Sequence, residues 1–309
     1  MAMEILWRGN ANAWECDELG HLNVRFYLAK AAEAVGALAQ KIAMPQAFQT
    51  RATATLAARS MTVRFLAEVL PGSPLAIRGG ILDHDGTGLT AVLMLDHCAL
   101  ERPAAAFTVR LDHYSPHSSR VFPWASRTLE ALDALRVQPP AGISARSLSD
   151  GPAATGVTLE RADALGLEEV GRGMINPHET DALGRMRVEF AFGKISNSVV
   201  HLQSGFPEQW AAFRDNRAPD AASAVLEARL NFHRFPHAGT GYVVRTGLAS
   251  VTDKVRTLVH WVCDPATGGP LWTMEAVGCL MDLKARKLKA PDAQTLAAMK
   301  GAVIDGLKA

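Results

Sequence analysis

The sequence contains few cysteines, and they form no pattern typical of a metal site. The four cysteines of the 309 residues are Cys16, Cys98, Cys263 and Cys279. They form no CxxC pair and have no His–Cys spacing of the kind that binds zinc, and the histidines form no HExxH or HxH pair. We therefore expect buried free thiols in a reducing compartment, no metal and no redox cofactor.

An excess of one charge and long apolar runs are also missing. Lys and Arg number 32 against 31 Asp and Glu, so a formal net charge of +1 excludes a global field that would attract nucleic acid or an anionic membrane. The N-terminus lacks the basic and apolar regions of a signal peptide, and no run is long enough to cross a bilayer. We expect a cytoplasmic protein with no nucleic-acid partner and no membrane span, long enough for two medium domains.

What the sequence does contain is an internal repeat. The segment NAWECDELG at 12–20 returns as NPHETDALG at 176–184, at the offset of 164 residues that separates Asp17 from Asp181. The match continues without a gap, because Val24, Phe26 and Lys30 face Val188, Phe190 and Lys194. One short chance match would not extend so far, so the chain consists of two diverged copies of one unit.

Periodicity predicts the same order of elements in both copies. Apolar residues at helical spacing predict a helix over 23–43 and a second over 188–203, with a loop near 207–219. Alternating or β-branched runs separated by turn residues then predict antiparallel strands, over 54–70, 75–84, 89–98 and 105–112 in the first copy and 224–235, 241–252, 254–263 and 271–283 in the second. A helix apolar on more than one side must be wrapped by its sheet, so we predict an α+β fold.

The repeat also sets the predicted domains. We expect a first domain, a proline-rich linker with a short helix at 126–135, a second domain and a C-terminal helix capped by Asp292. Their limits are 1–115, 116–153, 154–290 and 291–309.

The motif of the first copy resembles the signature of a known family. Residues 14–23, WECDELGHLN, followed by Phe26 and Tyr27, look like the Asp-x-x-Gly-His-x-Asn signature of 4-hydroxybenzoyl-CoA thioesterase-like hotdog proteins. Two copies in one chain make it similar to a tandem, double-hotdog member. The resemblance implies two hotdog domains, each a long central helix wrapped by a five-stranded antiparallel sheet, forming an intrachain pseudo-dimer. It further implies an acyl-CoA thioesterase, with coenzyme A as part of the substrate and no cofactor.

The chemistry of these residues fits that activity. Thioester hydrolysis needs a carboxylate to activate water or attack the carbonyl carbon, and donors for the developing oxyanion. Asp17 lies before a turn at Gly20, next to a helix N-terminus with free N–H groups. The resemblance makes Asp17 the general base or nucleophile, the backbone N–H groups of Asn23 and Val24 the oxyanion donors, and His21 and Asn23 orienting residues. Without its neighbours, Asp17 is better explained as a helix cap, and the full motif reverses that preference.

The second copy departs from the motif. It keeps Asp181 but has Arg185 and Arg187 in place of the histidine and asparagine. Either Asp181 is structural in a degenerate copy, which we favour, or it serves a second catalytic site whose arginines bind an acidic acyl group or a phosphate.

Other residues are candidates for substrate binding. Tyr27 follows the motif, and several basic residues precede turns where they could bind coenzyme A phosphates, namely Arg59, Arg64, Arg229, His233 and Arg234. Solvated charges at strand edges explain the basic residues as well. The predicted partner is an acyl-CoA or an acyl carrier protein thioester, and a homo-oligomer of pseudo-dimers is compatible with the fold.

Two other functions compete with hydrolysis. An enoyl-thioester hydratase on the same fold needs an Asp and a His about the alkene, but those families separate the two by four residues and here Asp17 and His21 have three between them. A non-catalytic acyl-CoA binding or sensor protein is the other alternative, and the fuller motif of the first copy argues against it.

Overall fold

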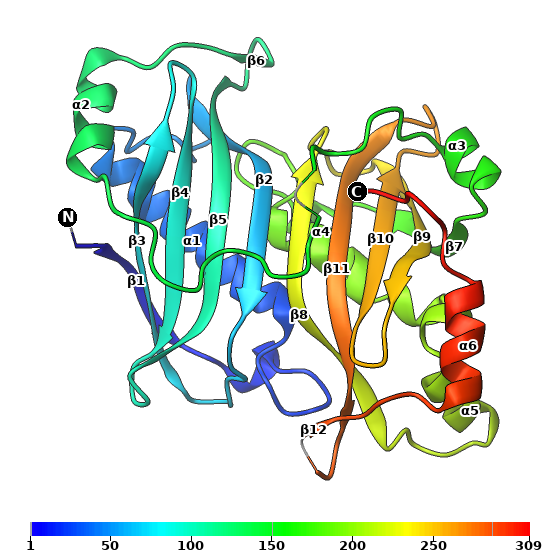
Figure 1. Cartoon of the computed structure of the whole chain (residues 1–309). Coiled ribbons are helices and arrows are strands. Elements are labelled where there is room, and N and C mark those ends of the chain that lie inside the picture. The colour runs from blue at the N-terminus through cyan, green and yellow to red at the C-terminus, as the bar shows by residue number, and fades with distance from the viewer. Residues whose placement is uncertain (1, 150, 286) are drawn as a thin grey trace. The chain divides into compact units, whose positions relative to one another are not determined.

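The computed structural model describes residues 2–149, 151–285 and 287–309 (Figure 1). The chain divides into two compact units: unit 1 is Met1–Ala145 with Asn176–Phe192, and unit 2 is Arg146–Ile175 with Gly193–Ala309. The second copy of the motif, at 176–184, thus lies in unit 1, whereas the predicted domain limits place it in the second domain.

Unit 1 is an antiparallel sheet packed against one long helix. The strand order is β1-β3-β4-β5-β2. The helix α1 (Val24–Lys41) packs on β1, β3 and β4 and buries small and aliphatic side chains such as Ala31, Val35 and Leu38. The strands are β1 (Glu4–Asn10), β2 (Thr55–Phe65), β3 (Pro74–His84), β4 (Gly88–His97) and β5 (Arg102–Ser115), with a short β6 (Arg120–Val121) and the helix α2 (Ser126–Ala134) after them.

Unit 2 repeats this order of strands. From the edge strand that corresponds to β1, its order is β7-β9-β10-β11-β8. The helix α4 (Val188–Ser196) begins among the unit 1 residues and ends in unit 2. The strands are β7 (Glu168–Met174), β8 (Ala221–Phe232), β9 (Gly241–Val251), β10 (Arg256–Cys263) and β11 (Pro270–Asp282), with β12 (Lys287–Leu288) paired to β11. Further helices are α3 (Leu159–Ala164), α5 (Pro207–Arg214) and α6 (Ala293–Gly301).

The predicted strands, the first helix and the helix in the linker are confirmed, except that the strand expected over 54–70 ends at Phe65. Two predicted helices are wrong in extent. The helix expected over 188–203 ends at Ser196, followed by 3₁₀ turns at Val199–His201 and Gln203–Gly205. The Ser198 hydroxyl donates to the Lys194 carbonyl oxygen at 3.0 Å, and such side-chain bonds compete with the helix ladder. The loop expected near 207–219 contains α5 instead.

The C-terminal helix begins where its cap predicts but ends early. The Asp292 carboxylate accepts the backbone N–H of Thr295 at 2.8 Å. The helix stops at Gly301, a poor helix former, and the chain then pairs with β9, where the Ile304 N–H donates to the Leu248 carbonyl oxygen at 2.9 Å.

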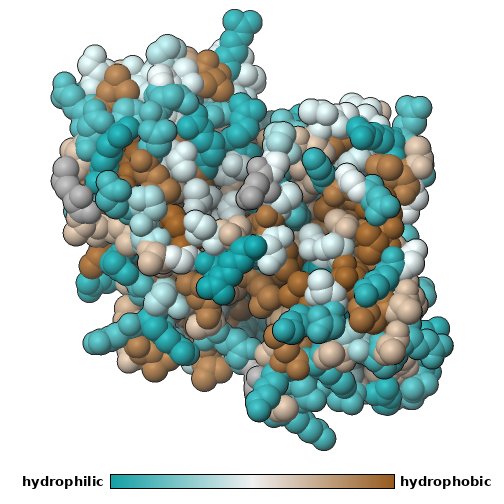
Figure 2. Space-filling view, in the orientation of Figure 1, coloured by the Kyte–Doolittle hydropathy of each residue, from teal (hydrophilic) through white to brown (hydrophobic). Residues whose placement is uncertain are grey.

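The outer face of the unit 2 sheet has its own apolar cluster. Trp261 and Cys263 of β10 pack there with α3 residue Ala162 and the C-terminal residue Leu307. In the view of Figure 2, hydrophilic and hydrophobic residues are mixed over the surface. No helix within the described ranges is both long enough and apolar enough to span a bilayer.

Candidate functional site

The motif of the first copy forms a loop that is tied to α1 by Glu15. The Asn12 backbone N–H donates to Glu15 Oε2 at 2.8 Å, and the Asn23 N–H donates to the Glu15 carbonyl oxygen at 2.9 Å. Lys30 of α1 donates to both carboxylate oxygens, at 2.9 and 2.8 Å. With Lys30 only 3% exposed, this ion pair fixes the loop against the body of unit 1.

Asp17 closes the turn with one carboxylate oxygen and keeps the other open. Oδ1 accepts the backbone N–H of Leu19 at 2.9 Å and of His21 at 3.3 Å. Gly20, at φ +77°, supplies the left-handed residue that this turn needs. Within the described part of the chain, no hydrogen bond or ion pair reaches Asp17 Oδ2. The carboxylate is therefore held in one orientation, with an oxygen left for substrate or water.

His21 leads to a second carboxylate that sequence reasoning missed. His21 Nε2 lies 3.4 Å from Glu68 Oε2, and Glu68 follows β2, 47 positions along the chain from His21 (68 − 21). The loop is placed there because the Leu22 N–H donates to the Val69 carbonyl oxygen at 2.8 Å. No sequence signal links these two segments, so Glu68 could be found only from the fold.

Tyr27 lies beneath this loop as a buried side chain. Its hydroxyl donates to the Ala67 carbonyl oxygen at 3.1 Å, and its ring meets Phe65 edge-on at 5.2 Å. Burial raises the pKa of Tyr27, and the nearby charges of Glu68 and Asp17 raise it further. Tyr27 is therefore a neutral wall of the site.

Of the two predicted oxyanion donors, one is already engaged. The Asn23 backbone N–H is bound to Glu15, and its side chain caps α1 by accepting the Arg25 N–H at 3.0 Å. The Val24 N–H, at the first position of α1, has no hydrogen-bond partner among the described residues. Helix N-terminal N–H groups stabilise negative charge, so Val24 is the donor that the geometry leaves available.

The second copy forms the same turn, but both oxygens of its aspartate have partners within the protein. Asp181 Oδ1 accepts the N–H groups of Leu183 and Arg185, both at 2.9 Å. Its other oxygen, Oδ2, accepts Nε and Nη2 of Arg185 at 3.1 and 2.9 Å. Arg187 pairs at 3.0 Å with Glu189, whose pKa is raised by burial. Both arginines thus have carboxylate partners within the protein.

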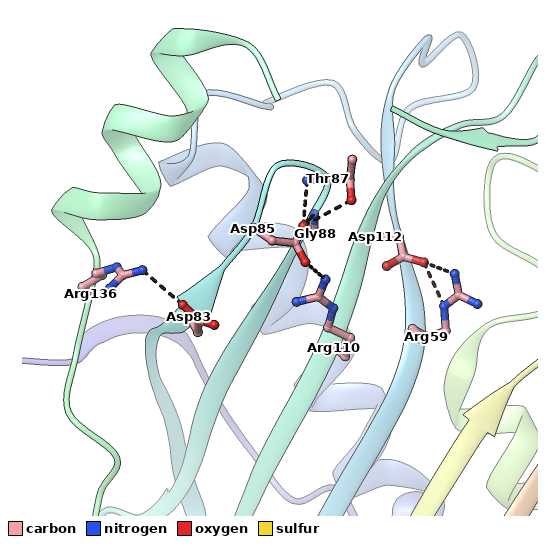
Figure 3. A network of polar contacts seen from close by, with 8 residues as sticks. All are labelled: Arg59, Asp83, Asp85, Thr87, Gly88, Arg110, Asp112 and Arg136. Atoms are coloured by element: carbon pink, nitrogen blue, oxygen red, sulfur yellow. Dashed lines mark hydrogen bonds and ion pairs between the residues drawn. The ribbon is translucent and has the colours of Figure 1, made fainter. Parts of the chain in front are cut away.

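The other predicted phosphate-binding arginines of unit 1 also bind protein groups. Arg59 pairs with Asp112 at 2.8 Å in a surface network on the strands (Figure 3). Arg64 is buried and donates to the Gly142 carbonyl oxygen. Binding of coenzyme A phosphates by Arg59 and Arg64 stays a prediction. No group of three or more His, Cys, Asp or Glu residues suited to a metal ion occurs in the described ranges.

Comparison with known proteins identifies the family. The family model described as the Thioesterase-like superfamily matches residues 11–132 and 175–299, which carry both copies of the repeat. None of the curated proteins compared with the sequence matches it.

Solved structures share the fold over most of the chain. An acyl-ACP thioesterase from Bacteroides thetaiotaomicron superposes with a TM-score of 0.63 at 8% identity, over 88% of this chain and 96% of that one. The 12:0-ACP thioesterase from Umbellularia californica gives 0.65 at 8%, over 89% and 93%. A protein assigned as an oleoyl thioesterase from Lactobacillus plantarum gives 0.66 at 9%, over 94% and 98%.

At these identities the structures establish the fold alone, a hotdog-type thioesterase fold with two repeats and antiparallel sheets. The family model covers well over half of the residues, and it includes both motifs. The chain therefore belongs to the Thioesterase-like superfamily.

Proposed function

We propose that the protein hydrolyses an acyl-CoA thioester at the first copy of the motif, with Asp17 as the general base or nucleophile. One observation carries the proposal: Asp17 Oδ1 is fixed by two backbone N–H groups while Oδ2 has no partner among the described residues. In the second copy the same oxygen is bound by Arg185. Of the two aspartates, only Asp17 has a carboxylate that is held in place by backbone N–H groups and still has an oxygen without a protein partner.

In the general-base route, Asp17 Oδ2 accepts a proton from water as the water oxygen attacks the thioester carbonyl carbon. The carbonyl oxygen becomes an oxyanion, which accepts the Val24 N–H at the start of α1. Collapse breaks the carbon–sulfur bond, and the thiolate takes up the proton to leave as coenzyme A. In the nucleophile route Asp17 first forms a mixed anhydride, which water then hydrolyses. Both routes balance as thioester plus water giving acid plus thiol.

His21 and Glu68 extend this site. A histidine held beside a carboxylate has a defined ring orientation, so His21 can hold the water or the thioester next to Asp17. Tyr27 contributes an apolar ring and keeps its proton. We assign His21 an orienting role and Asp17 the chemical step.

At the level of the whole chain, we infer that the two copies are tandem hotdog domains that pair as an intrachain pseudo-dimer. The repeated strand order and the repeated motif loop support this. An acyl carrier protein thioester is the alternative substrate, since two proteins of the same fold are acyl-ACP thioesterases. Coenzyme A enters as part of the substrate, and the chain needs no cofactor for this chemistry.

The test measures thiol release from a panel of acyl-CoA esters, short, medium, aromatic and carboxylated, by the intact protein. Asp17→Asn should lower kcat/KM by about a hundredfold or more. Asp181→Asn, its matched counterpart in the second copy, should leave the rate within about twofold, because its side chain is already paired. A folded Asp17→Asn variant with full activity would remove the proposed mechanism. Binding of coenzyme A without turnover of any ester would favour a sensor.

A further inference from the structure

Unit 2 contains a cavity of about 450 Å³ beside its edge strand β7. The cavity is lined by residues of β7, of the end of α4 with the turn after it, and of β9, including Gly171, Arg172, Asn197, Ser198 and Tyr242. All of them belong to unit 2. The volume lies within the range of small-molecule sites.

The repeat shows what occupies the matching place in unit 1. Strands β1 and β7 have the same length, the same burial pattern and a bulge at the same position, so Gly171 corresponds to Trp7. The Trp7 ring lies with its centre 5.1 Å from Lys30 Nζ, and its Nε1 donates to Glu33 Oε2 at 2.8 Å. It also covers Gly9, where an added Cβ would come within 2.6 Å of the ring. In unit 1 an indole of the chain itself fills the space.

In unit 2 an aromatic ring from another strand replaces only part of that indole. Tyr242 of β9 lies with its ring centre 5.2 Å from Lys194 Nζ, and an added Cβ on Gly173 would come within 2.8 Å of its hydroxyl. Lys194 and Gly173 are the counterparts of Lys30 and Gly9. The contacts to lysine and glycine are therefore kept. Asn197 is the counterpart of Glu33. The part of the cavity next to Gly171 and Asn197 receives no side chain from position 171, because that residue is glycine.

We propose that this cavity binds a planar heteroaromatic ligand, with its ring against Tyr242 and its polar edge at Asn197. Aromatic rings pair favourably in stacked or edge-on geometry, so Tyr242 offers a wall for a ring. Glu33 only accepts a hydrogen bond from the Trp7 indole, whereas the Asn197 amide both donates and accepts. A nucleobase, which has a donor and an acceptor on one edge, fits this amide better than an indole does. The site is independent of thioester hydrolysis.

Binding is tested on the full chain by saturation-transfer NMR and calorimetry, with adenosine, indole and cyclohexanol as probes. Adenosine should bind at least tenfold more tightly than cyclohexanol, which has a ring of similar width without π electrons, and more tightly than indole. Equal binding of adenosine and cyclohexanol, or no binding of either aromatic probe, would overturn the proposal.

Two variants locate the site. An added Cβ at Gly171 would lie 2.6 Å from Ser198 Oγ and 2.7 Å from Ser198 Cβ, so Gly171→Trp is combined with Ser198→Gly, which removes both atoms. This pair should weaken adenosine binding at least tenfold. Asn197 is exposed, so Asn197→Glu leaves the fold intact, and it should reverse the preference from adenosine to indole. If both variants bind adenosine and indole with unchanged affinity, the probes bind elsewhere and the proposal is wrong.

Discussion

Arg185 binds the carboxylate oxygen of Asp181 that corresponds to the open oxygen of Asp17, through Nε at 3.1 Å and Nη2 at 2.9 Å. Both aspartates close the same turn with Oδ1, so the two loops share a backbone and differ in one side chain. A two-point contact from a guanidinium group neutralises the carboxylate and fills the space before it. Both carboxylate oxygens of Asp181 thus have partners within the protein, which supports the proposal that Asp181 serves its turn and that the second copy is degenerate.

The first prediction concerns this pair. Arg185→Met should reduce the free energy of unfolding by about 1–3 kcal/mol, because it leaves a half-buried carboxylate without its partner. Thiol release should stay near the wild-type rate. Denaturant unfolding and the acyl-CoA assay measure the two effects. Arg59→Met is the control, since Arg59 pairs with Asp112 but is mostly exposed, and its effect should be smaller. A loss of activity as large as that of Asp17→Asn would mean that the second copy takes part in catalysis.

The second prediction separates positioning from chemistry at the first copy. Glu68→Gln keeps the shape but removes the charge beside His21, and should lower kcat about tenfold with little change in KM. Glu18→Gln removes a carboxylate from the same loop at an exposed position and should leave kcat unchanged. Steady-state kinetics on both variants checks this. Equal rates for the two variants would show that Glu68 has no part in orienting His21.

The sequence predicts the local features of this site well and its long-range contacts poorly. The turn at Asp17 and the helix that follows it depend on neighbours in sequence, so residue type and spacing suffice. Glu68 depends on which loop lies next to the motif, and no periodicity encodes that. The exclusion of Asn23 as an oxyanion donor follows from the Glu15 carbonyl oxygen, a backbone contact that residue types do not reveal.

The same distinction holds for the fold. Alternating or β-branched runs bounded by turn residues locate the inner strands, including β10, whose eight residues are all buried. The apolar pattern predicts too long a helix in the second copy, because apolar residues continue past Ser196. The Ser198 hydroxyl, bound to the Lys194 carbonyl oxygen, competes with the helix ladder there. The cavity beside β7 was not predicted at all. Its signal, Gly171 opposite Trp7 in the repeat, is visible only when the two copies are compared position by position.

The third prediction concerns the ion pair that holds the motif loop. Lys30→Met leaves the Glu15 carboxylate, whose side chain is only 12% exposed, without its counter-charge, and should cost about 3 kcal/mol of unfolding free energy. Thermal and denaturant unfolding measure the loss. Lys41→Met is the matched control, because Lys41 is at the other end of α1 and its pair with Glu4, at 2.9 Å, is exposed on both sides. Similar losses in the two variants would show that burial of the Lys30 pair does not matter for the loop.

The fourth prediction is a dependence of stability on pH from one buried histidine. His260 is 1% exposed, and its Nδ1 lies 2.8 Å from the Thr246 hydroxyl oxygen. Burial lowers the pKa of His260 to about 3, from 6.5 for the free side chain. Between pH 3 and pH 6.5, His260 therefore binds a proton in the unfolded chain but not in the folded chain. The stability that neutral His260 contributes is complete above about pH 6.5 and is lost as the pH falls toward 3.

Each pH unit in this window should cost the wild type about 1.4 kcal/mol of unfolding free energy relative to His260→Gln, a side chain that does not titrate. Denaturant unfolding of both proteins at pH 7, 6, 5 and 4 gives the difference between their unfolding free energies. The titration of the carboxylates, which the two proteins share, cancels in this difference. The matched control is His237→Gln, the same substitution at an exposed histidine. Parallel curves for wild type and His260→Gln would show that His260 takes up its proton in the folded state, and so that this part of the β9–β10 packing admits water.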